Sequence, residues 1–492
     1  MNPVQSDILL CTVNASYIHA SIGLRYLYAN LHKLQSRAAI LEFTTHLRAA
    51  EIVEKILLRK PQIIGFGIYI WNTQHTTQII ELIKTIAPDI KIIIGGPEVS
   101  YEYQQQRVFK LADHLITGAG DTAFGKLCQL LLQEPSKQPA KIFISQEPPL
   151  QQLALPYQYY TDEDIKNRVL YVEASRGCPF KCEFCLSALD KTALPFDIDI
   201  FLLEMDKLYQ RGARNFKFVD RTFNLKIETS LKILNFFLQR LDERLFLHFE
   251  IIPDRLPEQL KAVIVKFPSG CLQFELGVQT FNPQVQSIIS RKQKNDKTIA
   301  NLIWLKTYSN AHIHADLIFG LPGEDLDSFG RGFNTLYALK PHDIQIGILK
   351  RLRGTPVIRH SKLYDLKYET EAPYGIISTS EVDFFTLQKM VRFARYWELI
   401  ANSGQFNHTL SLFLKQHAFK RFYNFSDWLY QYSKKTHQIA LRKLFDYLYF
   451  GLKKKCLYDG DYQLNQAQLI EALLTDYKDA GLKGQPEFYK TI

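Results

Sequence analysis

Three of the seven cysteines lie close together in SRGCPFKCEFCLSALDK, residues 175–191. Cys178, Cys182 and Cys185 form a C-x-x-x-C-x-x-C pattern, and thiolates clustered in so short a loop are typical ligands of a metal centre. A structural zinc ion usually takes four protein ligands, yet no histidine or further cysteine occurs between Cys185 and His248. A [4Fe–4S] cluster held by three thiolates keeps one iron open. The pattern therefore favours an iron–sulfur centre with chemistry at its free iron, and a structural cluster or zinc clip is the alternative.

The elements that must position this loop alternate between strands and helices. Short apolar, β-branched runs occur at 7–13, 38–44, 62–70, 91–96 and 114–118. Stretches with helical spacing separate these runs. Strict alternation predicts a parallel sheet covered by helices on both faces, so residues 1–135 should form a doubly wound, Rossmann-like α/β domain. Ligands of such domains bind at the carboxyl ends of the strands.

A second series of strand-like runs accompanies the cysteine loop. After a linker predicted at 136–168, the runs lie at 168–175, 215–220, 245–251, 271–279, 313–322 and 343–352. Six βα units predict a partial (β/α)6, TIM-like barrel over 169–363, with its chemistry at the carboxyl ends of the strands. The strand pattern fades after residue 363, and we expect an α-helical C-terminal domain over 364–492.

The cysteine loop carries Phe184 just before its third cysteine and follows the first predicted barrel strand. In these features it resembles the cluster loop of the radical S-adenosylmethionine (radical SAM) enzymes. The resemblance implies that SAM binds the open iron through its amino and carboxylate groups, with Phe184 beside it. One electron from the cluster would then cleave a C–S bond of SAM and produce a 5′-deoxyadenosyl radical.

Three later segments, HFEIIPDRL, ELGVQTFNPQVQSIISRKQ and DLIFGLPGE, resemble strands of radical enzymes related to the oxygen-independent coproporphyrinogen dehydrogenases. The residues that the resemblance assigns to the methionyl, ribose and adenine groups of SAM are Glu250, Gln279, Arg291, Asp316 and Gly320. Carboxylate and amide oxygens suit hydroxyls and an ammonium, whereas a guanidinium suits a carboxylate. The family's Gly-Gly-Glu after the second strand is replaced here by Val219-Asp220-Arg221, and Asp220 is the expected substitute acceptor for the methionyl ammonium.

The N-terminal domain resembles the cobalamin-binding domain that many radical SAM enzymes carry in the same order. The matching pieces are NASYIHASIGLRYL, GIYIWN, GGPEVS and GAGD, each of which follows a predicted strand. A corrin ring needs a flat aromatic platform, and its nucleotide tail needs bare backbone in a slot. The residues expected to contact cobalamin are His19, Tyr69, Trp71, Asn72, Gly95 and Gly96.

The usual D-x-H-x-x-G element, which supplies an axial histidine to cobalt, is altered. Tyr17 occupies the Asp position, and Gly23 lies four residues beyond His19 instead of three. Gly67 replaces the Ser of the usual S-x-L element. An axial ligand, a polar loop histidine near the corrin and a helix-entry residue are the alternatives for His19. A Rossmann-like platform without a cofactor is the alternative for the domain.

Composition limits the class of protein. Hydrophobic residues make up 46% and charged residues 22% of the 492 positions, which are ordinary globular values. No apolar run has the length of a membrane span, and the N-terminal residues lack a secretory signal pattern, so we expect a cytoplasmic protein without a membrane partner. The four cysteines outside the loop, Cys11, Cys128, Cys271 and Cys456, are scattered singly, which fits a reducing compartment.

Most of the net charge of +10 lies near the C-terminal end. Residues 401–456 contain ten Lys or Arg against two Asp, and aromatic residues are interleaved with them between Phe406 and Tyr458. Basic and aromatic side chains together bind single-stranded RNA by phosphate contacts and base stacking. The plainer interpretation is a helical cap with buried aromatics and solvated lysines.

The sequence therefore predicts a cobalamin-dependent radical SAM enzyme with three cofactors: a [4Fe–4S] cluster, SAM and cobalamin. By resemblance it would methylate an unactivated carbon of a small-molecule substrate, with rearrangements such as ring contraction as alternatives. The expected electron donor is an external one-electron reductant resembling flavodoxin or ferredoxin. A tRNA- or RNA-modifying radical enzyme is a second hypothesis, although the N-terminal domain offers only Cys11 and Cys128 as further cluster ligands. A non-catalytic cobalamin-linked sensor is a third hypothesis, which has no need for a radical-generating site.

Overall fold

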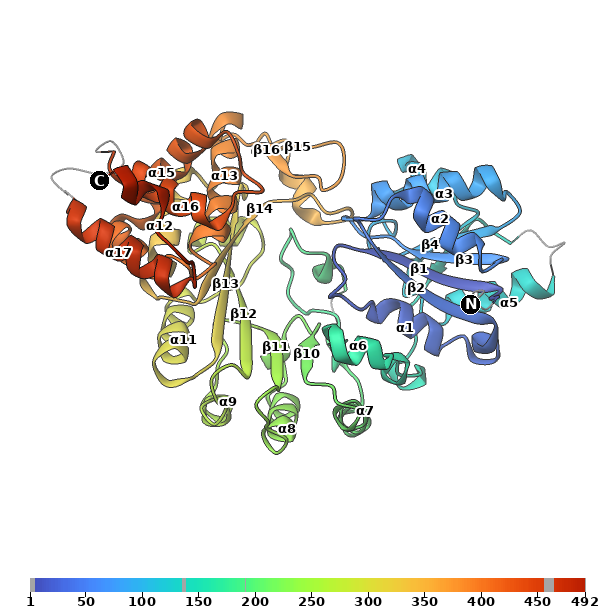
Figure 1. Ribbon diagram of the computed structural model, residues 1–492. Coiled ribbons are helices and arrows are strands. Elements are labelled where there is room, and N and C mark those ends of the chain that lie inside the picture. Colours follow the sequence, from blue (N-terminus) through green and yellow to red (C-terminus); the bar gives the residue numbers. More distant parts are fainter. Residues whose placement is uncertain (1–4, 135–138, 191, 455–463, 492) are drawn as a thin grey trace.

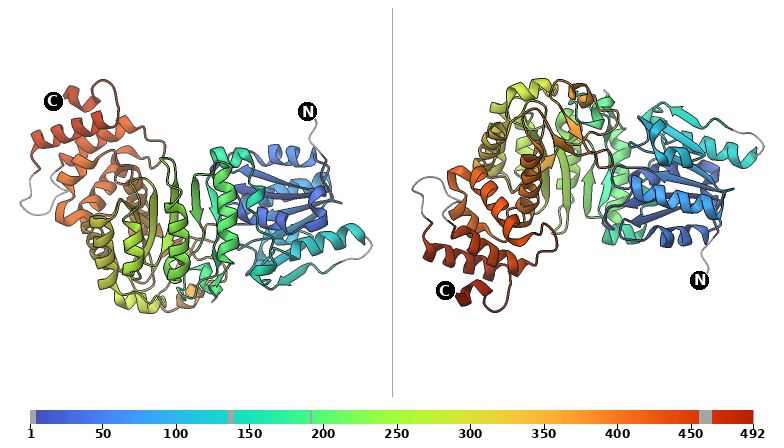
Figure 2. Two further views of the ribbon diagram at one scale, coloured as in Figure 1. Left: turned by 90° about the horizontal axis from the view of Figure 1, so that it is seen from below. Right: turned by 90° about the horizontal axis from the view of Figure 1, so that it is seen from above.

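A computed structural model describes residues 5–134, 139–190, 192–454 and 464–491. Three parts follow one another along the chain: a doubly wound domain, a partial barrel and a helical C-terminal region (Figure 1). The two further views show the barrel between the other two parts (Figure 2). The predicted α/β fold class and the order of its three parts are confirmed.

The first domain contains a six-stranded parallel sheet of order β2-β1-β3-β4-β5-β6. Its strands are β1 (Ile8–Asn14), β2 (Ala38–Thr44), β3 (Ile63–Gly67), β4 (Lys91–Gly95), β5 (His114–Gly118) and β6 (Ile142–Ser145). Helices α1 (Ile22–Ala29), α2 (Ala49–Leu57), α3 (Thr73–Ile86), α4 (Arg107–Leu111) and α5 (Ala123–Gln133) connect them. Separate apolar clusters lie on the two faces of the sheet, as a doubly wound domain requires. The strand order reverses between β1 and β3, where such domains bind ligands.

The segment predicted as a linker at 136–168 contains a strand and a helix. Its residues Ile142–Ser145 form β6, which extends the first sheet. The segment also contains the short helix α6 (Asp162–Asn167), whose first turn is capped by Thr161. The Pro, Gln and Ser residues around these elements suggested a linker, but an apolar β-branched run as short as IFI is enough for an edge strand.

The second sheet is a partial barrel of parallel strands in the order β14-β13-β12-β11-β10-β7. Its strands are β7 (Leu170–Val172), β10 (Asn215–Phe218), β11 (Phe246–Ile251), β12 (Leu272–Gln279), β13 (His312–Phe319) and β14 (Asp343–Ile348). The helices on its outer side are α7 (Ile198–Gln210), α8 (Ile227–Leu238), α9 (Glu258–Ile264), α10 (Pro283–Ile288), α11 (Asn295–Tyr308) and α12 (Leu326–Ala338). Large apolar side chains such as Phe216, Phe249 and Phe274 are buried under these helices.

Two small antiparallel pairs of strands lie outside the barrel sheet. Strands β8 (Ser175–Arg176) and β9 (Leu194–Pro195) pair with each other, so they hold the two ends of the cysteine loop together. Strands β15 (Lys367–Tyr368) and β16 (Ile376–Ser378) form a second pair after the last barrel strand.

The C-terminal region consists of α13 (Phe384–Ile400), α14 (Asn407–Phe413), α15 (Ala418–Ser433), α16 (Leu441–Leu452) and α17 (Gln466–Asp479). Of the basic and aromatic segment, Phe422 and Phe425 are fully buried, whereas Tyr432 is exposed. Lys455 to Tyr458, which belong to the same segment, lie outside the described residues. Among the helices of the described residues, none is both long and apolar enough to cross a membrane.

A half-barrel leaves one side open, and here the first domain covers that side (Figure 1). Near the first barrel strand, His19 forms a β-bridge with Val169. Near the last barrel strand, buried Glu98 contacts Arg353 at 2.9 Å and accepts a hydrogen bond from Tyr374 at 2.6 Å. The first domain is thus attached to the barrel at both edges of the opening.

A buried ion cluster strengthens the junction near the first barrel strand. Glu42 on β2 contacts Arg25 at 3.0 Å and Arg168 at 2.8 Å, and Asp164 contacts the same two arginines at 2.7 and 2.9 Å. All four side chains are less than a tenth exposed. Charges buried to this extent are tolerated because each has partners of opposite sign.

Removal of Glu42 should destabilise this junction. Glu42→Ala leaves Arg25 and Arg168 short of one buried counter-charge, so we expect a loss of about 3 kcal/mol in the free energy of unfolding, measured with guanidinium. Burial would raise the pKa of Glu42, but the two arginines lower it below its ordinary value. The stabilisation should therefore be complete at neutral pH and disappear as the pH falls below about 4. Glu51→Ala, which removes an exposed ion pair with Arg48, is the control and should change nothing measurable. Equal stability of both variants would refute a role for the cluster.

Candidate active site

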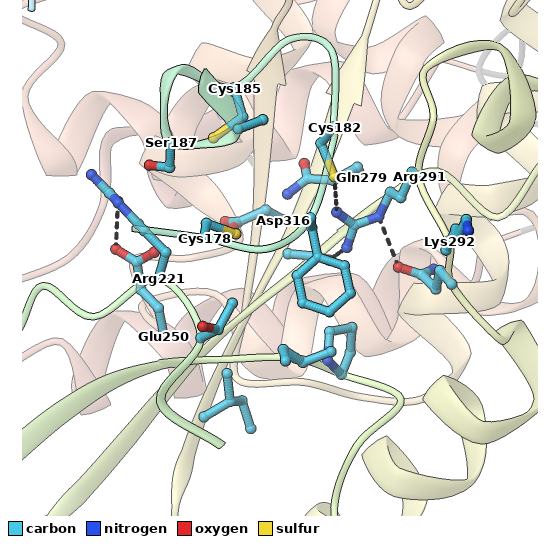
Figure 3. Close-up of a pocket in the computed structure, with 18 of the residues that line it drawn as sticks. Cys178, Cys182, Cys185, Ser187, Arg221, Glu250, Gln279, Arg291, Lys292 and Asp316 are labelled. Carbon is cyan, nitrogen blue, oxygen red and sulfur yellow. Dashed lines mark hydrogen bonds and ion pairs between the residues drawn. The ribbon is translucent and has the colours of Figure 1, made fainter. Parts of the chain in front are cut away.

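The cysteine loop and the carboxyl ends of the barrel strands enclose a cavity of about 220 Å³ (Figure 3). The sequence-predicted residues that line it are Cys178, Cys182, Phe184, Cys185, Glu250, Gln279, Arg291 and Asp316. They come from segments spread over more than a hundred residues of the chain, yet parallel strands bring their carboxyl ends to one edge. Asp220 and Gly320 are not among the described residues that line this cavity.

The three thiols share one wall of the cavity, as Figure 3 shows. Burial raises the pKa of the Cys178 and Cys182 thiols above the ordinary value, and the neighbouring cysteines raise it further. A bound metal centre offsets such a penalty because it stabilises thiolates directly. Within the described residues, no three His, Cys, Asp or Glu side chains form a site for a single ion. Three thiols spread along one cavity wall fit a multi-iron cluster, whose ligands bind different irons.

The backbone of the loop is shaped to present these thiols. Gly177 has a φ of 86°, and a Cβ atom there would lie 2.4 Å from the carbonyl oxygen of Thr192. The next residue, Cys178, donates its backbone N–H to Asp190 at 3.2 Å. Only glycine permits this close approach between the two ends of the loop.

Arg291 places a positive charge beside the cysteines. Its Nη1 lies 3.5 Å from Cys182 Sγ, and its Nε donates to Gln293 at 3.0 Å (Figure 3). Its Nη2 donates to the carbonyl oxygen of Gly277. With the side chain held from three directions, its charge can stabilise an anionic cluster or a carboxylate ligand in the cavity.

Two buried acceptors in the cavity lack a well-directed hydrogen bond within the described part of the chain. Gln279 Oε1 and Asp316 Oδ1 accept no well-directed hydrogen bond from any described residue, although Asp316 Oδ1 lies 3.3 Å from His314 Nε2. Gln279 has a φ of 70°, at a point where the register between β12 and β13 shifts. Strained backbone of this kind persists where it aims a side chain at a functional site. Hydroxyl or ammonium groups of a bound molecule would satisfy both acceptors, so the residues fit SAM.

The departure from Gly-Gly-Glu has a structural consequence. Asp220 accepts hydrogen bonds from the backbone N–H of Ala174 at 2.9 Å and from Ser175 Oγ at 2.6 Å, and burial raises its pKa to about 7. Arg221 instead lines the cavity, where its Nη1 contacts Glu250 Oε1 at 2.8 Å (Figure 3). A cation thus stands where the family motif has a carboxylate.

Gly320 packs against the second small strand pair. Its φ is 88°, and a Cβ atom there would lie 2.7 Å from Ile376 Cγ2 on β16. The bare backbone therefore permits β16 to lie against the end of β13.

A second cavity, of about 680 Å³, lies at the carboxyl edge of the first sheet. Its glycines are Gly23, Gly65, Gly67, Gly95, Gly96, Gly118 and Gly120, and Tyr69 and Phe124 also line it. Tyr69 and Trp71 stack with ring centroids 4.5 Å apart and planes 6° apart, and Trp71 is half exposed. A glycine-lined slot beside a flat aromatic pair fits a large planar group with a flexible tail, as cobalamin has.

The other two expected cobalamin residues make protein contacts. Asn72 is fully buried; its Nδ2 donates to the carbonyl oxygens of Val13 and Gly67, each at 3.1 Å, and its Oδ1 accepts from the N–H of Tyr69 at 2.8 Å. It therefore holds the turn that carries Tyr69 and Trp71. His19 Nδ1 lies 2.6 Å from the hydroxyl of Tyr171 on β7. Of the six residues expected to contact cobalamin, Tyr69, Gly95 and Gly96 line the second cavity, whereas Trp71, Asn72 and His19 are not among the described residues that line it.

The inner face of the barrel carries a belt of polar residues that was not predicted from the sequence. Tyr171, Lys217 and His248 are register neighbours across β7, β10 and β11, and Glu275, His314 and Asp343 are register neighbours across β12, β13 and β14. His248 Nε2 lies 2.9 Å from Glu275 Oε2 and joins the two halves. The available signal was the alternation of polar and apolar residues in FLHFEI, LQFELGVQ and HIHADLIF, because one face of each strand is covered by helices.

The belt carries charges of both signs at neutral pH. A hydrogen bond from His248, assisted by Lys217, lowers the pKa of Glu275 to about 2. Burial would lower the pKa of His314, but the neighbouring carboxylates of Asp316 and Asp343 raise it to about 10. Glu275 of the belt also lines the first cavity, so the belt forms part of its wall.

Three family models match the chain. The B12 binding domain matches residues 8–127, the Radical SAM superfamily matches residues 172–334, and a protein of unknown function, DUF4080, matches residues 362–489. The predicted pairing of a cobalamin-binding domain with a radical SAM domain is confirmed. At the level of these two families, the predicted cofactors are confirmed as well.

Two relatives are similar in sequence. An uncharacterized methyltransferase of Pyrococcus horikoshii is 23% identical over 329 residues, which cover 62% of this chain and 70% of the relative. The cobalamin-dependent radical SAM methyltransferase TokK of Streptomyces tokunonensis is 21% identical over 347 residues, which cover 62% of this chain and 49% of TokK. The match thus spans about half the length of TokK.

Two solved structures share the fold. The cobalamin-dependent SAM radical enzyme OxsB with aqua-cobalamin bound has a TM-score of 0.63 at 14% identity, over 98% of this chain and 82% of OxsB. The radical SAM methyltransferase TsrM of Kitasatospora setae, with cobalamin and a [4Fe–4S] cluster bound, has a TM-score of 0.56 at 16% identity, over 72% of this chain and 77% of TsrM.

The bulge at Gly277 offers a test of the first cavity. A Cβ atom at Gly277 would lie 2.4 Å from Gln279 Nε2, so Gly277→Ala must displace the Gln279 side chain. We expect about tenfold weaker SAM binding, measured by equilibrium dialysis, because a hydroxyl group of SAM loses its hydrogen bond to the displaced Gln279 side chain. The iron content should not change. Gly347→Ala on β14, where a Cβ atom meets only ordinary contacts of 3.6 Å or more, is the control. Unchanged SAM binding in Gly277→Ala would remove Gln279 from the SAM site.

Proposed function

We propose that this chain, which unites the B12-binding and radical SAM domains of the cobalamin-dependent radical SAM enzymes, methylates a carbon atom of a polar small molecule. The observation that carries the proposal is that one loop forms a wall of both cavities. Cys178, Cys182 and Cys185 line the first cavity, whereas Arg176 and Asp190, at the two ends of the same loop, line the second. Two cofactors bound in these cavities would be neighbours, as a reaction that uses both requires.

Each cavity would hold its own cofactor. Cys178, Cys182 and Cys185 would hold the [4Fe–4S] cluster, which when bound supplies the electron that cleaves SAM to a 5′-deoxyadenosyl radical. The second cavity would hold cobalamin, which when bound supplies the methyl group for the substrate carbon. Tyr69 and Trp71 would contact the corrin, with Gly95 and Gly96 beside its tail.

The residues of the first cavity would orient SAM. Arg291 would bind its carboxylate, because a guanidinium held beside Cys182 lies where that group must reach the open iron. Gln279 and Asp316 would accept hydrogen bonds from its hydroxyl groups. Glu250 would accept hydrogen bonds from the ammonium; burial raises the pKa of its carboxyl group, and the positive charge of Arg221 offsets part of that rise.

The polar belt would form the floor of the substrate site. The belt lies on the inner face of the half-barrel, whose open side the first domain covers. Lys217 and Glu275 are each 29% exposed within this interior, so they remain available to a ligand. A wall with charges of both signs favours a polar substrate over a hydrocarbon. Burial of Phe422 and Phe425 in the C-terminal core leaves these rings unable to stack on RNA bases, which supports a small molecule as the substrate.

Anaerobic reconstitution with iron, sulfide and hydroxocobalamin tests the function. We expect about four irons per chain and one corrin in the purified protein. Reduction with a flavodoxin- or ferredoxin-type donor, the kind of reductant that a cytoplasmic enzyme would use, should then give 5′-deoxyadenosine. Cys182→Ala should lose the iron and the nucleoside but keep the corrin. With SAM labelled in its methyl group, the label should pass to the corrin. A cluster and nucleoside without any corrin would contradict the cobalamin assignment.

Gly96 provides a separate test of the second cavity. Gly96 has a φ of 111°, and a Cβ atom there would lie 2.5 Å from the carbonyl oxygen of Ile68. Gly96→Ala should therefore shift the slot and weaken corrin binding about tenfold or more, read from corrin absorbance after gel filtration. Gly212 has a similar φ of 99° but no described atom within 4 Å of such a Cβ, so Gly212→Ala controls for backbone strain. Equal corrin retention by both variants would place the corrin elsewhere.

A further inference from the structure

The cysteine loop contains a buried carboxylate that the proposed chemistry does not use. Glu183 lies between Cys182 and Phe184, is 2% exposed, and is not among the described residues that line the first cavity. A carboxylate rarely becomes buried without strong partners. Its partners therefore indicate what it does.

The side chain of Glu183 contacts three groups from segments that follow β12 and β14. Its Oε1 accepts a hydrogen bond from Ser290 Oγ at 2.5 Å and forms an ion pair with Arg359. Its Oε2 lies 2.8 Å from His360 Nε2. Ser290 follows α10, and Arg359 and His360 belong to the 3₁₀ helix Pro356–His360 after the last barrel strand.

The backbone of Glu183 is attached to the same two segments. Its N–H donates to the carbonyl oxygen of Ile289 at 3.1 Å, and its carbonyl oxygen accepts from the N–H of Val357 at 3.0 Å. Side chain and backbone together tie the middle of the cysteine loop to the segments after β12 and β14. The pair β8–β9 holds only the ends of the loop.

The residue after Ser290 contacts one of the sulfur ligands directly. Ser290 has a φ of 54°, and the next residue, Arg291, extends to Cys182 Sγ at 3.5 Å. Glu183 and Arg291 thus hold Cys182 between them. Outer contacts of this kind orient metal ligands, and their loss commonly weakens a metal site.

From this geometry we propose that Glu183 is a positioning residue for the cluster. It holds the cysteine loop in its binding shape before any iron arrives, through Ser290, Arg359 and His360. The inference rests on the proposed function, because it takes Cys178, Cys182 and Cys185 as the cluster ligands. Residues after β14 would thereby support the cluster although none of them is a ligand.

The first experiment uses the full chain without iron. Hydrogen exchange measured by mass spectrometry should show the amides of residues 178–185 exchanging about tenfold faster in Glu183→Ala than in the wild type, because the local opening becomes easier. Glu183→Gln keeps the shape and one acceptor oxygen, so it should restore most of the protection. Asp164→Ala removes a buried carboxylate from two arginines at the domain junction, and it is the matched control for general destabilisation.

The second experiment uses the reconstituted protein. Glu183→Ala should lose iron to a chelator about tenfold faster and give a broadened electron paramagnetic resonance signal of the reduced cluster, with the Gln variant close to wild type. Wild-type exchange and iron loss in Glu183→Ala, or equal effects in Asp164→Ala, would overturn the positioning role. Absence of iron from the wild-type protein would instead refute the proposed function, while the exchange experiment would still test the loop.

Discussion

A parallel sheet that stops at six strands leaves a half-barrel with an open side, and most of this structure follows from how that side is covered. The first domain lies across the opening and is attached at both edges, by the buried ion cluster and the His19 bridge at one edge and by Glu98, Arg353 and Tyr374 at the other. The attachment brings the carboxyl edge of one sheet to face the interior of the other. The ligand-binding edge of the first domain and that of the half-barrel therefore lie next to each other.

The cysteine loop lies at this meeting point and serves both cavities. Its ends are joined by β8 and β9, its thiols face the first cavity, and Arg176 near its start lines the second. Arg176 contacts Asp121 of the first domain at 3.1 Å, so the loop is also part of the junction. The loop thus lines the first cavity, lines the second cavity and contacts the first domain. The buried contacts of Glu183 hold its middle in place.

The barrel interior differs from the packed interior of a closed barrel. Closed barrels fill their centre with branched apolar side chains, whereas this half-barrel turns its apolar side chains to the helices and a belt of charged and polar residues inward. Neighbouring opposite charges make the belt tolerable, since His314 lies between Asp316 and Asp343 and Glu275 lies beside His248 and Lys217. An interior of this kind is suited to a polar ligand.

The sequence alone determined the order of the domains, nearly all the strands of the two six-stranded sheets and the cysteines of the cluster loop, because alternating apolar runs and short-range spacing are local properties of a chain. It also identified Glu250, Gln279, Arg291 and Asp316, which the fold brings into one cavity. Tertiary structure decided which side of a strand end each residue faces: Asp220 turns to Ala174 and Ser175, while Arg221 enters the cavity. It also decided the partners of His19, Asn72 and Glu183, and which polar residues of the six barrel strands become neighbours in the belt. These depend on register and on contacts between distant segments, which no local pattern encodes.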